Sequence, residues 1–296
     1  MLSSRRPHAS AHARQFIDAF FALHSFSCRL GICFRRPPLP ATAAQAPQIA
    51  ARSYILLDSG SHRVMLEKNA DERLQPASLT KMMTAYVVLD ALKASTIKWE
   101  QLVRVEASDL AHVGGDEATM RLQAGQIISI QDLLTGLIVV SANDAAMVLA
   151  RTVAGSEDAF LGKMNDYANR LGLSASHFAT PSGITTPNHY STARDIAHLS
   201  VRLTEDFPVY LAFSAQRDFS YGSFTRHNKN RLLDDPTIDG LKTGHTAKAG
   251  YCLAVTAKRS VAKGKAMRRV FAVVLGAPSN DGRFVAGRQL IDYGFH

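Results

Sequence analysis

The sequence predicts a mixed α/β (α+β) fold, with an antiparallel sheet built from both chain ends and flanked by a helical middle. Short apolar runs between turn residues occur near residues 53–68 and again after residue 219, which is typical of strands. The residues between them carry apolar positions at helical spacing. Strands at both ends with helices between them predict a sheet that joins the two ends.

The folded part begins with a predicted hairpin. Ser53–Asp58 and Val64–Lys68 are strand-like and are joined by turn residues. A largely buried helix is expected next, from Pro76 to Leu92, because proline fits the first turn and apolar residues continue through it. Ser78 and Lys81 fall in the first turn of that helix.

The helical middle is marked by capping signatures. Ser129 and Asp132 form a capping box that predicts a helix ending at Val140, and Thr192 with Asp195 opens another. Between them, Ser141–Asn143 is predicted to form a tight turn, because Ser and Asn favour turns over helix interiors. The remaining helices are expected at 145–153, 157–171 and 192–204.

After this the pattern changes to strands. They are predicted at 219–227, 240–246, 252–258 and 269–276, and an amphipathic helix at 282–293 closes the chain. No internal repeat divides the chain, so residues 47–296 are predicted to form one domain.

The first 46 residues differ from the rest. They contain six arginines and one acidic residue, Asp18. Basic residues precede a partly apolar stretch, and Ala44-Gln45-Ala46 offers small residues for cleavage, so we predict an export-signal-like or disordered leader at 1–46. Whether it is cleaved is left open.

The overall charge does not indicate nucleic-acid binding. The net charge is +9, but more than half of it lies in the leader, and no basic stripe interleaved with aromatic residues follows. The histidines His177, His189 and His198 lack a metal-ligand spacing, so neither a metal nor a cofactor is expected. Cys252, alone in the predicted domain, is expected to be a buried apolar residue.

Three short motifs carry the chemistry. The pattern S-x-x-K occurs at Ser78/Lys81, Ser95/Lys98 and Ser260/Lys263. S-x-N occurs once, at Ser141-Ala142-Asn143, 63 residues after Ser78, and K-T-G occurs once, at Lys242-Thr243-Gly244, 101 residues further on. The order of the three motifs and these intervals together favour Ser78 and Lys81.

A serine and a lysine one helical turn apart can act as nucleophile and base. Positions i and i+3 share a helix face, so the Ser78 hydroxyl can meet the Lys81 amine. Lys81 can accept a proton only when it is neutral. Lowering a lysine pKa from about 10.4 to near 7 requires burial or a second cation, and Lys242 is the expected cation.

The other two motifs fit a substrate with an amide and a carboxylate. Ser141 can relay a proton to the leaving amine, and the Asn143 side chain can donate to and accept from an amide. The Lys242 amine and the Thr243 hydroxyl suit a carboxylate, and Gly244 lets the strand approach the ligand closely. The predicted chemistry is acyl transfer.

Together the motifs resemble the active-site set of penicillin-binding proteins and serine β-lactamases. Nearly all of residues 51–296 is similar to the low-molecular-mass penicillin-binding D-alanyl-D-alanine carboxypeptidases. The similar stretches are 76–83, 141–145, 191–195, 239–246 and 248–251.

The resemblance implies a β-lactamase/transpeptidase-like fold and export to the periplasm or cell envelope of a bacterium. It implies removal of the terminal D-alanine from peptidoglycan stem peptides through an acyl-enzyme on Ser78, with β-lactams acylating the same serine. It also implies an oxyanion hole from the backbone N–H groups of Ser78 and His245. The implied catalytic residues are Ser78, Lys81 and Ser141, and the implied substrate-binding residues are Asn143, Lys242, Thr243, Gly244 and His245.

Alternatives remain open at this stage. A class A β-lactamase would need a glutamate after S-x-N, and none lies between Glu157 and Glu205. A D-Ala–diaminopimelate endopeptidase uses the same machinery, and an inactive peptidoglycan-binding protein is the non-enzymatic alternative.

The chain also departs from the family pattern. The family often has Asn-Arg-Asn where this chain has Asn228-Lys229-Asn230. Many members carry a further β-rich domain and a C-terminal amphipathic anchor, so membrane attachment is left open.

Overall fold

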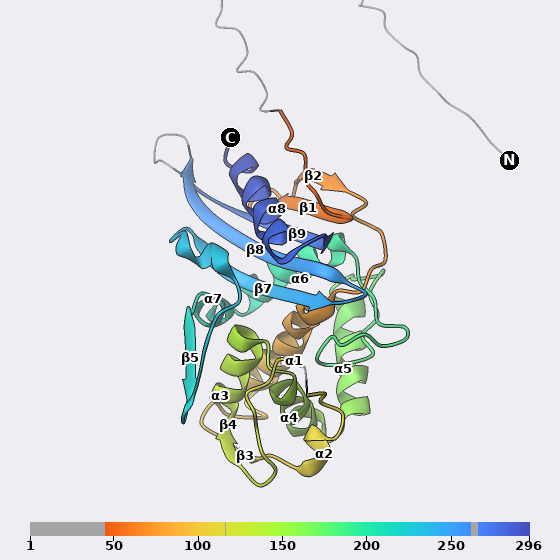
Figure 1. Ribbon diagram of the computed structural model, residues 1–296, viewed down its shortest axis with the longest axis vertical. Helices are drawn as coiled ribbons and strands as arrows, with labels where there is room; N and C mark the ends of the chain where they lie inside the picture. The colour runs from red at the N-terminus through yellow and green to blue at the C-terminus, as the bar shows by residue number, and fades with distance from the viewer. Residues whose placement is uncertain (1–44, 116, 262–265) are drawn as a thin grey trace, which may run out of the picture. The chain divides into compact units, whose positions relative to one another are not determined.

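The computed structural model describes residues 45–115, 117–261 and 266–296. Nearly all of the predicted leader, 1–46, including Cys28 and Cys33, lies outside these residues. Figure 1 shows the central sheet with helices on both of its faces and a mainly helical region beside it.

The central sheet has five antiparallel strands in the order β2-β1-β9-β8-β7. It confirms that both chain ends build one sheet, because β1 lies between β2 and β9, the last strand. In chain order the bounds are β1 Ser53–Asp58, β2 Val64–Lys68, β7 Ile238–Thr246, β8 Gly250–Val261 and β9 Ala266–Ala277.

Alternate residues of the central strands face two separate cores. Ile55, Phe271 and Val273 point to the core shared with the helical middle. Their neighbours Leu56 and Val270 point to the core under the C-terminal helix α8 (Asn280–Tyr293). Because a sheet buried on both faces needs apolar residues on both sides, β8 and β9 contain continuous apolar runs, at 252–255 and 270–275.

The other helices lie in the helical middle or beside the sheet (Figure 1). They are η1 Ala77–Thr80, α1 Lys81–Lys93, α2 Ala107–Leu110, α3 Ile130–Thr135, the π-helix η2 Gly136–Val140, α4 Asn143–Ala154, α5 Glu157–Arg170, α6 Ala193–Asp206, α7 Val209–Ser214 and η3 Arg231–Asp234.

Several predicted elements are corrected by the structure. The single strand expected at 219–227 is a separate hairpin of β5 (Asp218–Tyr221) and β6 (Phe224–His227). A second small sheet, β3 (Leu102–Arg104) with β4 (Ile127–Ser129), was not expected. The helix expected to end at Val140 leaves the α conformation after Thr135 and continues as the π-helix.

Of the two hydrogen bonds in the predicted capping box of α6, only the one accepted by Thr192 is present. The Thr192 hydroxyl accepts from the Asp195 N–H, which caps the helix. The Asp195 carboxylate, however, accepts from the backbone N–H of Ala175 and the hydroxyl of Ser176. It therefore fastens a preceding loop to α6.

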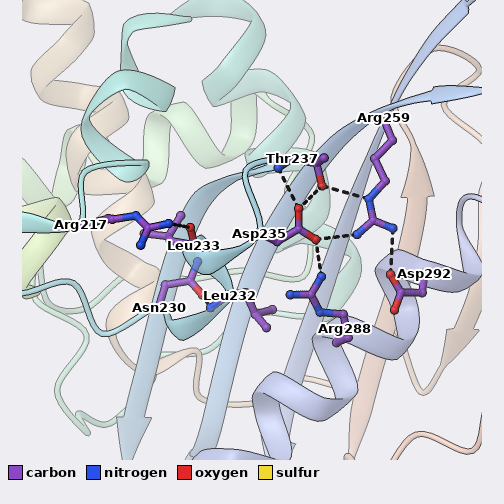
Figure 2. Close-up of polar contacts among 9 residues, drawn as sticks. All are labelled: Arg217, Asn230, Leu232, Leu233, Asp235, Thr237, Arg259, Arg288 and Asp292. Carbon is purple, nitrogen blue, oxygen red and sulfur yellow. Dashed lines mark hydrogen bonds and ion pairs between the residues drawn. The ribbon is translucent and has the colours of Figure 1, made fainter. Parts of the chain in front are cut away.

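A partly buried carboxylate ties η3 to the sheet and to α8. Figure 2 shows Asp235 accepting from Thr237, Arg259 and Arg288, which lie in the turn before β7, on β8 and on α8. The Arg259 guanidinium also donates to Asp292 at 2.8 Å. Burial raises the pKa of Asp235, but the hydrogen bonds from the Thr237 hydroxyl and N–H, and then Arg288 and Arg259, hold it below its ordinary value. This network fixes the chain just after Asn228-Lys229-Asn230.

Within the described ranges, no helix has both the length and the apolar character that crossing a membrane would require.

Candidate active site

Ser78 lies in η1, immediately before α1, and not in the first α-helical turn as predicted. The preceding residue, Ala77, has a left-handed φ of +49°, a conformation that residues other than glycine rarely adopt. Gly183 packs directly against this turn, because a Cβ there would lie 2.1 Å from the Ala77 carbonyl oxygen. Ser78 therefore lies on a tightly held turn.

The Lys81 amine is fully buried and has three partners. Its Nζ lies 3.0 Å from Ser78 Oγ, 2.5 Å from Asn143 Oδ1 and 2.5 Å from the Ser182 carbonyl oxygen. The hydroxyl and the amine thus meet as the i, i+3 spacing predicted.

The surroundings of Lys81 lower its pKa from 10.5 to about 7. Burial is the largest cause and the positive charge of Lys229 is the second, while Glu117 and Asp144 act in the opposite direction. The cation that lowers this pKa is therefore Lys229, where the sequence favoured Lys242. At neutral pH a large fraction of Lys81 is free to accept a proton.

A chain of hydrogen bonds stabilises the turn that carries Ser78. The Thr80 hydroxyl donates to the Ala77 carbonyl at 2.7 Å and lies 2.7 Å from His189 Nε2. His189 Nδ1 accepts from the Ala179 N–H, which places its proton on Nε2, toward Thr80. Burial lowers the pKa of His189 to about 4, so the ring is neutral and serves as a structural support.

The S-x-N motif forms the predicted turn between two helices. Ser141 ends η2 in a left-handed conformation, with φ +66°, and the Ala142 N–H bonds to the Gly136 carbonyl. Asn143 then begins α4. Ser141 lines the same cavity as Ser78, so the second motif reaches the site of the first.

The neighbouring Asp144 anchors the segment that borders this turn. Its buried carboxylate accepts from the backbone N–H groups of Met120, Leu122 and Ala145, each at 2.9–3.0 Å. The Asn143 N–H adds a bond of 2.7 Å to the Ala118 carbonyl. Residues 118–122 are consequently held against the start of α4.

The third motif lies on β7, beside Ser78. A Cβ on Gly244 would lie 3.0 Å from the Ser78 backbone nitrogen and 3.1 Å from the Pro76 carbonyl oxygen, so glycine allows the close approach that the sequence predicted. His245 follows, with its exposed ring stacked on Tyr251 at 4.1 Å between centroids. Its position after Gly244 suits the backbone role that the resemblance implied.

Lys242 is buried, and its amine donates to the Thr243 carbonyl at 3.0 Å. Burial first, and then the positive charge of Lys81, take its pKa well below the ordinary value. Lys242 is not among the residues that line the cavity, although Thr243 and Gly244 are. This amine is therefore buried behind the residues that line the cavity.

The three motifs surround one cavity of about 370 Å³. It brings together η1, the start of α4, β7 and α8. Besides the motif residues, it is lined by Glu117, Ala118, Gly183, Ile184, Lys229, His245, Thr246, Tyr251, Asn280 and Arg283. Over the described residues, no group of three or more metal-ligand side chains gathers anywhere.

Arg283 and Glu117 are cavity residues that the sequence analysis missed. Arg283 lies on α8, and its guanidinium donates to the Gly244 carbonyl at 2.9 Å and to Asn280 Oδ1 at 2.5 Å. Its Nε is buried without a partner among the described residues. No short motif marks either residue, because Glu117 contacts Asn143 and Arg283 contacts Gly244, and both partners lie far away in the sequence.

Residues 40–279 match the family described as D-alanyl-D-alanine carboxypeptidase. The chain belongs to this family. The D-alanyl-D-alanine carboxypeptidase DacC of Escherichia coli is 42% identical over 257 residues, which are 85% of this chain and 62% of that protein. This chain therefore spans less than two thirds of the length of DacC.

Solved structures of penicillin-binding proteins share the fold. Penicillin binding protein 5 from Haemophilus influenzae superimposes with a TM-score of 0.79 at 39% identity, covering 84% of this chain and 72% of that one. Penicillin-Binding Protein D2 from Listeria monocytogenes, in its ampicillin-bound form, gives 0.74 at 29% identity, covering 84% and 99%. The family and the fold that the sequence resembled are thus confirmed.

Proposed function

We propose that residues 47–296 form a serine-type carboxypeptidase domain that removes the terminal D-alanine from peptidoglycan stem peptides. Membership of the D-alanyl-D-alanine carboxypeptidase family supports the substrate class. The proposed catalytic residues are Ser78, Lys81 and Ser141.

The observation that carries the proposal is the set of contacts made by the Lys81 amine. A neutral amine has two N–H donors and one lone pair. Asn143 Oδ1 and the Ser182 carbonyl, both at 2.5 Å, can accept the two donors. The lone pair then faces Ser78 Oγ, 3.0 Å away, and Lys81 can take the hydroxyl proton as Ser78 attacks.

The reaction is proposed to proceed in two halves. Ser78 Oγ bonds to the carbonyl carbon of the penultimate D-alanine, and the backbone N–H groups of Ser78 and His245 stabilise the resulting oxyanion. The C–N bond then breaks as the proton passes from Lys81, by way of Ser141, to the departing D-alanine nitrogen. Water hydrolyses the serine ester, returning a proton to Ser78.

The terminal carboxylate of the substrate is proposed to bind at the sheet side of the cavity. Thr243 and Arg283 line it there, and the Arg283 guanidinium is already fixed by Gly244 and Asn280. Lys229 also lines the cavity and adds an amine to the hydroxyl and the guanidinium. A fixed guanidinium and a hydroxyl suit a carboxylate, so Arg283 joins Lys242 and Thr243 as a candidate receptor.

The substrate class places the proposed activity in the bacterial cell envelope, after export. β-Lactams are proposed to acylate Ser78, because they present a strained amide to the same nucleophile and a carboxylate to the same receptor. The ampicillin-bound form of a structurally similar penicillin-binding protein supports this proposal.

The test is release of D-alanine from diacetyl-Lys-D-Ala-D-Ala by the wild type and by Ser78→Ala, with labelling by a fluorescent penicillin followed in parallel. We expect release and labelling with the wild type and neither with the variant. A cross-linked peptide dimer serves as a second substrate, and faster cleavage of the dimer would favour the endopeptidase alternative. Activity that survives in Ser78→Ala would refute the proposal.

A further inference from the structure

Among the described residues that line the cavity, Glu117 is the only acidic one. The cations Lys229 and Arg283 come from the sheet side, on the loop after β6 and on α8. Glu117 comes from the helical side, on the segment between α2 and β4. The cavity is therefore electrically polarised, positive along the sheet and negative beside the S-x-N turn.

The segment that carries Glu117 is fixed in place by backbone contacts. The Ala118 carbonyl accepts from the Asn143 N–H at 2.7 Å, and the N–H groups of Met120 and Leu122 bond to the Asp144 carboxylate. On its other side, the Glu117 N–H bonds to the Gly114 carbonyl at 3.2 Å. The carboxylate is thus held at the cavity by the same residues that begin α4.

The Glu117 carboxylate still has acceptor capacity. It accepts one hydrogen bond, from Asn143 Nδ2, whereas an ionised carboxylate offers about four lone-pair sites. No Lys or Arg side chain forms an ion pair with it among the described residues. Asn143 Nδ2 keeps its second hydrogen for a substrate carbonyl, so binding there leaves this contact intact.

The orientation of the substrate follows from the proposed function, on which this inference rests. With the terminal carboxylate at Thr243 and Arg283, the leaving D-alanine lies on the sheet side of Ser78. The acyl half of the peptide then extends toward Asn143 and Glu117. A positive group on that half would meet the negative end of the cavity.

We propose that Glu117 is a specificity-determining residue that receives a side-chain ammonium on the acyl half of the peptide, carried by the residue before the two D-alanines. The Glu117 contact with Asn143 holds the carboxylate toward the substrate. The charged pair is partly exposed to water, where such pairs contribute about 1 kcal/mol or less. This corresponds to a preference of about threefold to fivefold in kcat/KM.

The test compares two peptides that differ only in charge: Nα-acetyl-Lys-D-Ala-D-Ala, with a free ε-ammonium, and its diacetylated form. Wild type, Glu117→Gln and Glu117→Ala are assayed at low and high salt, with the exposed Glu100→Gln as the matched control. Gln keeps an acceptor for Asn143 but loses the charge. We expect wild type and Glu100→Gln to prefer the ammonium peptide, more strongly at low salt, and Glu117→Gln to lose the preference, because its rate on the ammonium peptide falls relative to its rate on the neutral peptide at the same pH.

An equal preference in wild type and Glu117→Gln would overturn the assignment. Equal losses on both peptides in Glu117→Gln would also overturn it, because they would indicate a purely structural role. Release of D-alanine from both peptides at equal rates by the wild type would refute only the role of Glu117. Failure of the wild type to cleave either peptide would refute the proposed function, and the role of Glu117 with it.

Discussion

The pH dependence of kcat/KM is expected to report the ionisation of Lys81, and Lys229→Gln is expected to shift it. kcat/KM follows the ionisations of the free enzyme. Because Lys81 accepts a proton only when neutral, the rate should rise with pH through a midpoint near 7, the pKa that its surroundings give it. Lys229 is the cation that lowers this pKa, so its removal should move the midpoint upward.

The size of the shift follows from the causes of the lowered pKa. Taking Lys81 from 10.5 to about 7 corresponds to about 5 kcal/mol at 1.36 kcal/mol per pH unit, and burial is the larger cause. A unit charge roughly 10 Å away contributes about 1.7 kcal/mol at an effective dielectric constant near 20, and water in an open cavity reduces it. We therefore expect Lys229→Gln to raise the midpoint by about half to one pH unit.

The assay is the initial rate on diacetyl-Lys-D-Ala-D-Ala below its KM, across the neutral range and at constant ionic strength. The matched control is Lys163→Gln, which removes one exposed charge on α5. Glu117→Gln should move the midpoint downward, because the Glu117 charge raises the pKa of Lys81. If the Lys229→Gln profile superimposes on that of the wild type, Lys229 does not set the pKa of the base.

Three further substitutions test the site. Ser78→Ala should abolish penicillin labelling, and Ser95→Ala should leave it intact, as judged by mass mapping of the labelled peptide. Label retained in Ser78→Ala would disprove the assignment of Ser78 as the acylated residue. Gly244→Ala should lower kcat/KM at least about tenfold by pushing β7 away from Ser78. Gly162→Ala should not lower it, because a Cβ there meets open space. Equal activity of the two variants would contradict the close approach of Gly244 to the Ser78 backbone. Asp144→Ala should lower the free energy of unfolding by several kcal/mol, because each buried N–H left unpaired costs about 1–3 kcal/mol. The free energy is measured by urea titration, with the exposed Asp166→Ala as the control. A loss of unfolding free energy no larger than that of the control would show that the Asp144 hydrogen bonds are dispensable.

The sequence predicted the features that depend on local spacing. The Ser78/Lys81 pair, the turn at Ser141–Asn143 and the strand that carries Gly244 all meet at one cavity, since each motif is a short segment with its own conformational preference. The sequence also predicted that one sheet is built from both chain ends, because strand patterns occur near both ends and helical patterns lie between them.

The features that were missed depend on contacts between distant segments. Glu117 lies in an irregular stretch whose conformation is imposed by the Asp144 carboxylate. Arg283 reaches the cavity only because α8 folds across the sheet, which no local pattern encodes. The assignment of Lys242 as the charge beside Lys81 failed because burial decides which amine keeps its proton, and burial is a property of the assembled fold.

The pairing of β1 with β9 has a consequence for how the chain acquires its structure. Tyr54 pairs with Val274, so β1 cannot join β9 until the residues of β9 have emerged from the ribosome. Closing so long a loop carries a large entropic cost that later contacts must offset, and folds rich in such distant pairings form slowly. Folding of the sheet therefore waits for β9, and Ser78 meets Gly244 only after β7 has been made.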